Sequence, residues 1–156
     1  MVTDDLTRRD IPSAGASLLV PSSWVDLSDG VDDVVAAWAA PVEPNAFRSN
    51  VVVTEDRVAA ETPWTSLADQ TWTALESLLT DARLLEEQAP EGEGGLVRWI
   101  HHRVGEVGVV LHQVALRRGD RVLTTGVTVP VLGLPDVEET VRAVAAGLRL
   151  EAGVES

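Results

Sequence analysis

The sequence of 156 residues contains no cysteine, no lysine and no tyrosine, and it has one phenylalanine. The absence of cysteine excludes disulfide bonds, thiolate catalysis, cysteine-ligated zinc and a lipid-modified cysteine anchor. Long hydrophobic runs are also missing. The longest one, Val34 to Ala40, has seven residues, far fewer than the ~20 that cross a bilayer. The sequence therefore predicts no transmembrane helix.

Positive charge is scarce. The chain has 25 acidic residues against 12 basic ones, which gives a formal net charge of -13. All the basic residues are arginine, a bias typical of GC-rich coding sequence. Nucleic acids and anionic membrane surfaces are bound through clustered cations, so we expect neither nucleic acid nor a membrane as a partner. Basic proteins are favoured instead, because an acidic surface accelerates their association by long-range attraction.

The first residues of the chain mix acidic side chains with Arg8 and Arg9 and contain little apolar surface. They lack the charged-then-apolar layout of an export signal. The short apolar stretch that follows stops at Pro21. We therefore expect a flexible N-terminal segment over residues 1–13 and a cytoplasmic location.

Several segments carry the pattern of β-strands, in which β-branched and apolar residues are bounded by turn residues. They cover residues 16–20, 48–54, 83–88, 96–104, 107–117 and 121–129. Short turns at 105–106 and 118–120 separate the last three, which is typical of antiparallel hairpins. The segment 31–41 fits a strand or a short helix, and its periodicity does not decide between them. The turn-rich run 90–95 separates strands and not domains.

Two segments show helical spacing. From Trp64 to Ala82, apolar residues recur at steps of three and four and so share one face. A second amphipathic pattern follows Gly133 and ends near Leu148. Pairs of residues with the spacing of helix caps stand near both expected starts. These pairs are Ser66 with Asp69, and Asp136 with Glu139.

These elements predict one α+β domain over residues 14–150. In it, an antiparallel sheet of about six to seven strands is flanked by two main helices. The length fits a single domain, and no linker divides the pattern. The tail at residues 151–156 is expected to fray.

Two local motifs add to this order of elements. One is Leu19-Val20-Pro21-Ser22-Ser23-Trp24, a strand end followed by Pro-x-x-Trp, and the other is the strand Phe47-Arg48-Ser49-Asn50-Val51-Val52-Val53. An amphipathic helix from Leu67, a Gly94-Gly95 turn before a hairpin that carries Gln113, and a terminal helix accompany them. From about Ala16 to Leu150 the chain resembles the PsbP-like α/β sandwich, in particular its bacterial DcrB-like and LpqN-like branch.

The resemblance implies that the protein binds a partner and does not catalyse a reaction. Members of the wider fold serve as a photosystem accessory subunit, a Ran-binding factor, surface lipoproteins, and chaperones that shield apolar helices of secretion effectors. The chain departs from the LpqN-like lipoproteins because it has no cysteine to acylate and no signal peptide is visible in it.

All three histidines lie in the expected hairpin around Gly105-Glu106. A two-residue turn there places Trp99 opposite His112, and it places His101 and His112 on one sheet face as diagonal neighbours. Two imidazoles supply part of a zinc site, but the glutamate in the turn points away and a third ligand is missing. We therefore interpret the histidines as structural neighbours of Trp99.

Other residue patterns do not predict catalysis. The adjacent carboxylates at 32–33, 86–87 and 138–139 diverge on either a strand or a helix. The serines lack a Gly-x-Ser-x-Gly elbow. The glycines at 92, 94 and 95 lead into a strand and not into the helix start that cradles a phosphate. We expect no enzyme, no metal and no cofactor.

Trp64 stands at the start of the first expected helix, where an exposed indole anchors a partner or a buried one packs on the sheet edge. The second interpretation is favoured. Trp64, Trp99, His101 and His112 are the candidate partner-binding residues of a non-enzymatic adaptor or chaperone-like domain. Its expected partner is a protein or peptide that is basic or carries an apolar helix. The alternative is a carrier of a small hydrophobic ligand between helix and sheet. We expect a monomer or a homodimer.

Overall fold

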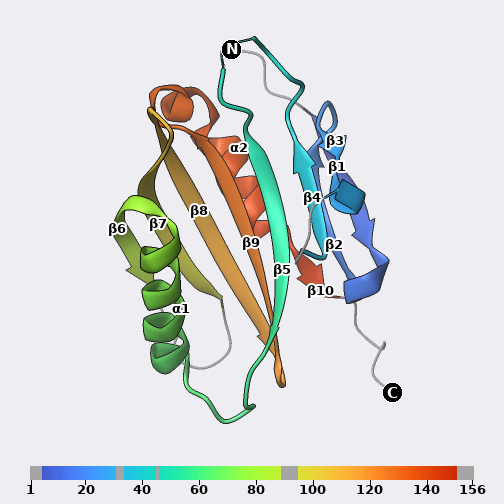
Figure 1. The fold of residues 1–156 in the computed structure, drawn as a ribbon. Helices are drawn as coiled ribbons and strands as arrows, with labels where there is room; N and C mark the ends of the chain where they lie inside the picture. The colour runs from blue at the N-terminus through green and yellow to red at the C-terminus, as the bar shows by residue number, and fades with distance from the viewer. Residues whose placement is uncertain (1–4, 31–33, 45, 89–94, 151–156) are drawn as a thin grey trace.

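The computed structural model describes residues 5–30, 34–44, 46–88 and 95–150. In this part of the chain, ten strands form two antiparallel sheets, and two α-helices pack against them (Figure 1). The strands are β1 (Leu6–Ile11), β2 (Ala16–Pro21), β3 (Val25–Asp26), β4 (Ala36–Ala39), β5 (Asn50–Arg57), β6 (Thr80–Gln88), β7 (Leu96–Val104), β8 (Val107–Arg118), β9 (Arg121–Pro130) and β10 (Arg149–Leu150). The helices are α1 (Trp64–Leu78) and α2 (Leu134–Ala146). The large sheet has the order β3-β4-β5-β9-β8-β7-β6, and the small sheet has the order β1-β2-β10.

The expected α+β fold with a large antiparallel sheet is confirmed. Each predicted strand is present, and β7 has the predicted bounds. The undecided segment 31–41 contains the strand β4, while residues 31–33 lie outside the described residues. The tail 151–156 and the turn-rich run 90–95, apart from Gly95, also lie outside them.

The N-terminal segment differs from the prediction. Residues 1–13 were expected to be flexible, but β1 pairs with β2 along its whole length, from Leu6 opposite Pro21 to Ile11 opposite Ala16. Ile11 is buried in the main core. Arg8 donates from Nη1 to Ser17 Oγ at 2.8 Å. The sequence hides this strand because Thr7 to Asp10 are four consecutive polar residues with no apolar alternation, although each of them is paired with a residue of β2.

The hairpin β7-β8 has the predicted register. Gly105 adopts φ +61°, which favours glycine in the turn,. Trp99 lies opposite His112, and His101 lies opposite Val110. Since neighbours two apart on a strand share a face, the side-chain faces of β7 and β8 follow from this turn.

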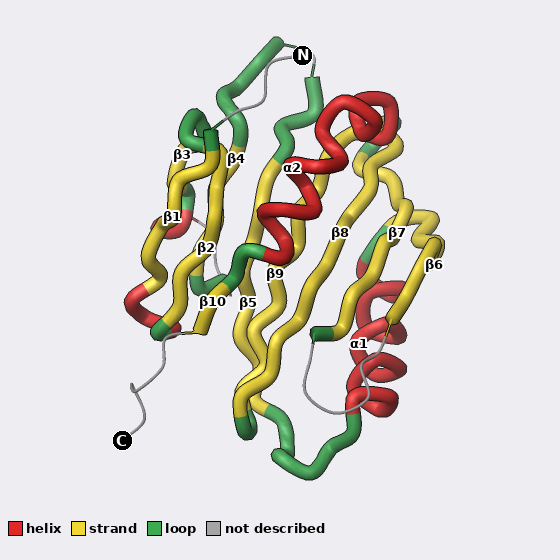
Figure 2. The backbone as a smooth tube through the Cα atoms, turned by 180° about the vertical axis from the view of Figure 1, so that it is seen from behind, coloured by secondary structure: helices red, strands yellow, loops and turns green. Residues whose placement is uncertain are grey.

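The two helices cover opposite faces of the large sheet and are offset from each other (Figures 1 and 2). α2 packs on β8, β9 and β2, between the two sheets. Its buried side chains join the main core with Trp38, Val51 and Val127. α1 lies on the other face beside β6. It forms a smaller core of Trp64, Leu67, Ala68, Leu96, Ala115 and Val122.

The predicted caps are wrong for both helices. Extended Pro63 precedes α1, and its carbonyl accepts from the Ser66 amide at 3.1 Å, so Ser66 lies inside the first turn. Gly133 precedes α2, and Asp136 lies in the first turn without capping it. A proline at or beside each start replaces the side-chain cap, because it has no N–H that needs a partner. No helix among the described residues has the length and hydropathy to cross a membrane.

Candidate functional site

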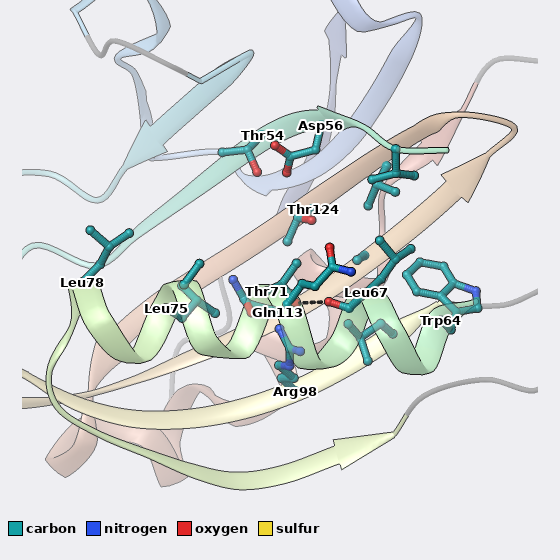
Figure 3. A pocket seen from close by; sticks show the side chains of 16 residues that line it. Thr54, Asp56, Trp64, Leu67, Thr71, Leu75, Leu78, Arg98, Gln113 and Thr124 are labelled. Carbon is teal, nitrogen blue, oxygen red and sulfur yellow. Dashed lines mark hydrogen bonds between the residues drawn. The ribbon is translucent and has the colours of Figure 1, made fainter. Parts of the chain in front are cut away.

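A groove of about 380 Å³ lies between α1 and the strands β5, β9 and β8 (Figure 3). One wall is the apolar face of α1, from Trp64 and Leu67 to Leu75 and Leu78. Because α1 is displaced toward β6, it leaves this part of the sheet face without a helix over it (Figure 1). The offset of the helix is therefore what opens the groove.

Burial decreases along the helix wall. Leu67 and Ala68 in the first turns are buried, Leu75 is half-buried, and Leu78 in the last turn is 79% exposed. The amphipathic spacing predicted a continuous buried face, but only its first half is covered by the sheet. The second half is a row of apolar side chains that borders the groove and solvent. Such an uncovered apolar surface on a small domain is typical of a binding site.

Arg117 fixes the loop that leads into α1. Its Nη2 donates to the carbonyl oxygens of Ala59 and Ala60, each at 2.7 Å, and its Nη1 donates to the carbonyl of Thr62. A guanidinium group presents several donors in a rigid plane. One side chain of β8 thus holds three carbonyl oxygens of the loop that leads into α1.

Arg98 anchors the N-terminal half of α1 to the sheet. Its side chain is 2% exposed, its Nε forms an ion pair with Glu87 at 2.7 Å, and its Nη2 donates to the carbonyl of Ala68. The ion pair neutralises a charge that would otherwise be costly to bury. Arg98 therefore connects β7 to both β6 and α1, and it closes the floor of the groove on that side (Figure 3).

The rest of the floor is polar. Thr54 of β5 and Thr124 of β9 are directly paired across the strands, and Gln113 lies opposite Arg98. Within the described part of the chain, the amide of Gln113 and the carboxylate of Asp56 at the rim have no hydrogen bond or ion pair. The groove thus combines an apolar wall with uncommitted polar groups, the composition expected of a recognition site.

Three of the four predicted residues lie on the opposite face of the sheet. The rings of Trp99 and His112 stack with centroids 3.8 Å apart and planes inclined by 20°. Arg142 of α2 lies 4.8 Å from the Trp99 ring. His112 Nδ1 donates to the carbonyl oxygen of Arg98 at 2.9 Å. Burial lowers the pKa of His112, against the opposing effect of this hydrogen bond,, so a neutral imidazole packs on the indole.

His101 shares that face but is only half-buried. It lines an open hollow with Arg83 and Arg103. Among the described residues, no group of three histidine, aspartate or glutamate side chains is placed to hold a metal ion. His102 lies on the α1 side of the sheet, and burial lowers its pKa,.

Trp64 is buried, with 8% of its surface exposed, and it packs against Leu96, Ala115 and Val122. Its indole closes one end of the groove and does not project from the surface (Figure 3). The four predicted residues therefore do not form one site. A partner-binding role for each of them stays a prediction.

Sequence reasoning missed the groove floor. Its signal was present in the strands, because Thr124 and Gln113 are polar at positions whose alternation places them on the same face as Val122 and Ala115,. Polar residues on a face that a helix is expected to cover indicate that the cover is incomplete. The sequence did not show where α1 lies on the sheet, and this position is needed to predict the groove.

No family model and no curated protein matches the sequence. Solved structures do match it over nearly its whole length. The Ran-binding protein Mog1p of Saccharomyces cerevisiae has a TM-score of 0.69 at 11% identity, with 95% of this chain and 96% of that one covered. Cyanobacterial PsbP (CyanoP) from Synechocystis has a TM-score of 0.63 at 16% identity, covering 96% and 94%.

A third similar structure is LpqN of Mycobacterium tuberculosis, described as involved in cell envelope biogenesis. It has a TM-score of 0.62 at 12% identity and covers 92% of this chain and 89% of its own. At these identities the likeness shows the fold. The chain has the PsbP/Mog1 fold, and the resemblance expected from the sequence is confirmed at this level.

Proposed function

We propose that this chain is a non-enzymatic protein-binding domain, and that the groove beside α1 holds an apolar segment of a partner that also carries a cationic residue. The observation that carries this proposal is the uncovered apolar row of α1, ending at Leu78, with the unpaired carboxylate of Asp56 across the groove on β5. The apolar side chains supply the area to be buried, and the carboxylate selects the charge of the partner.

The size and chemistry of the groove support a short segment as the occupant. A volume of about 380 Å³ lies near the lower end of the ~300–1,000 Å³ typical of ligand sites, which accommodates a few side chains. Gln113 offers both a donor and an acceptor at the floor,. A bound peptide needs such groups for its own backbone, because buried backbone polar groups are costly when unpaired.

The overall charge supports a basic partner. A net charge of -13 attracts a cationic protein over distances longer than a contact and raises the rate of association, an effect that salt weakens. Mog1p, which shares the fold, is described as a Ran-binding protein. Because one fold serves many functions, the groove and its charge carry the proposal, and this likeness is secondary support. A cytoplasmic location stays a prediction, to be tested by cell fractionation.

The proposal is tested with a synthetic amphipathic peptide of leucine and arginine and an analogue with glutamate in place of arginine. We expect the basic peptide to give saturable NMR shift changes at amides of α1, β5 and β9, and the acidic analogue to bind more weakly. Leu78→Ser weakens binding about tenfold, the factor that corresponds to about 1.4 kcal/mol of lost apolar burial.

Leu132→Ser is the matched control, because Leu132 is an exposed leucine in the turn before α2. Asp56→Asn is expected to remove the preference for the basic peptide. The proposal is wrong if the shifts map away from the groove, or if Leu78→Ser and Leu132→Ser bind alike.

A second candidate, a carrier of a small hydrophobic ligand, uses the same groove. Its volume and its apolar wall from Leu67 to Leu75 favour this function. Native mass spectrometry of the purified chain separates the two. A co-purified small mass, lost in a variant with Ala74→Trp filling the groove, supports the carrier. Its absence, together with peptide binding, supports the protein-binding domain.

A further inference from the structure

The face of the sheet opposite the groove has its own uncovered region. α2 packs on β8 and β9, and β6 and β7 extend beyond it to the sheet edge (Figure 2). There the structure has an open hollow of about 680 Å³, lined by Asp81, Ala82, Arg83, Leu85, His101 and Arg103. Four of these six side chains are ionisable, in contrast to the mostly apolar groove beside α1.

The strand register brings the basic side chains together. Arg83 of β6 lies directly opposite His101 of β7, and Arg103 lies two residues further along the same strand. Since directly opposite residues and residues two apart share a face, all three project to the same side. The result is a basic cluster on a chain whose net charge is -13.

The partners of these side chains differ. Arg103 forms an ion pair with Asp81 at 2.7 Å, which orients its guanidinium group. Among the described residues, Arg83 and His101 have no hydrogen bond or ion pair. An unpaired guanidinium and an imidazole therefore face the hollow, with a second guanidinium held beside them. The single carboxylate lining the hollow is already engaged by Arg103.

We propose that this hollow binds the oxyanion group, a phosphate or a carboxylate, of a small organic ligand. Guanidinium groups bind such anions with two parallel hydrogen bonds, which are stronger than hydrogen bonds between neutral groups. Arg83 is the primary binding residue, and His101 and Arg103 add donors from the neighbouring strand. The site is separate from the groove and does not depend on the proposed function.

Leu85 indicates what else the ligand contains. It is exposed, and it lines both this hollow and a neighbouring one of about 390 Å³, whose lining has apolar residues that include Trp99 and Leu134 and also has Glu86 and the ion-paired Glu138 and Arg142. A ligand whose anionic group lies at Arg83 therefore has an apolar surface within reach across Leu85. This arrangement fits an organic anion with an apolar body better than it fits a free inorganic ion.

The test uses NMR titration of the full chain with inorganic phosphate, acetate and octanoate. We expect saturable shift changes at the amides of residues 82–85 and 101–103. Arg83→Gln weakens binding about tenfold, as expected for the loss of one charge-assisted pair. Arg149→Gln is the matched control, because it removes the same charge from an exposed position in the small sheet.

The three probes separate the sources of the anion. Tighter binding of octanoate than of acetate supports an apolar body over Leu85, and Leu85→Ser then removes the difference. Tighter binding of phosphate than of acetate assigns the site to a phosphorylated ligand. The proposal is overturned if none of the probes gives saturable shifts at β6 and β7, or if Arg83→Gln and Arg149→Gln bind equally.

Discussion

His112 donates a hydrogen bond to the carbonyl oxygen of Arg98 at 2.9 Å, although the side chains of the two residues lie on opposite faces of the large sheet. The Arg98 side chain supports α1, and the His112 ring packs on Trp99 beneath α2. One hydrogen bond therefore links the supports of both helices.

Stability is expected to fall in mild acid. Burial lowers the pKa values of His102 and His112 in the folded chain below their ordinary value of 6.5. As the pH falls below that value, the unfolded chain takes up protons that the folded chain does not, so the free energy of unfolding decreases. Urea unfolding midpoints measured between about pH 7.5 and 5.5 test this. His112→Gln is expected to flatten the decrease, and an unchanged slope in that variant would contradict the assignment.

Removal of Arg98 is expected to cost far more stability than removal of a surface arginine. Arg98→Met leaves Glu87 without its partner and the Ala68 carbonyl without a donor, at a cost of about 2–3 kcal/mol,. Arg57→Met is the control. It breaks an exposed ion pair with Asp120 and costs less than about 1 kcal/mol. Equal unfolding free energies for the two variants would show that the buried pair is not needed.

Gly147 is expected to tolerate no side chain. A Cβ atom there would lie 2.9 Å from the Ala143 carbonyl oxygen and 3.0 Å from Leu19 Cβ. Gly147→Ala therefore forces the end of α2 away from β2 and costs about 1–3 kcal/mol. At Gly133 a Cβ would meet no atom within 4 Å, and Gly133→Ala changes stability by less than about 0.5 kcal/mol. Thermal unfolding of both variants measures the difference.

Arg117 is expected to control the position of α1 more than the stability of the sheet. Arg117→Met removes the donors to the carbonyls of residues 59, 60 and 62, so the loop and α1 open more often. Hydrogen exchange of α1 amides is expected to accelerate about tenfold, while β8 and β9 amides change little. Arg149→Met serves as the exposed control. Uniform acceleration over the whole chain would instead indicate a global loss of stability.

The β7-β8 hairpin of the large sheet was predictable because local chemistry specifies it. A two-residue turn at Gly105-Glu106 fixes the pairing of β7 with β8 by arithmetic, and the stack of Trp99 on His112 follows from that pairing. The small sheet was missed for a matching reason. β1 is largely polar and β10 has two residues, so their pairing depends on contacts with β2 that no short window of sequence contains.

The groove was not predictable, because it depends on where α1 rests and not on whether α1 forms. That position is set by side chains distant in sequence, Arg117 acting on the loop at 59–62 and Arg98 acting on Ala68. Helical periodicity marks a face to be buried but does not say how much of it the sheet reaches. For this reason the spacing alone groups Leu78 with the apolar face of the helix, and the structure leaves it in solvent.

The staggered placement of α1 and α2 has a steric consequence. The groove opens over β5 and β9 on one side, and the basic hollow opens over β6 and β7 on the other. A single layer of strands stands between them, so two molecules seated at these places do not collide. A ternary assembly, with this domain as the bridge between a peptide and an anion, is thus geometrically compatible with the architecture.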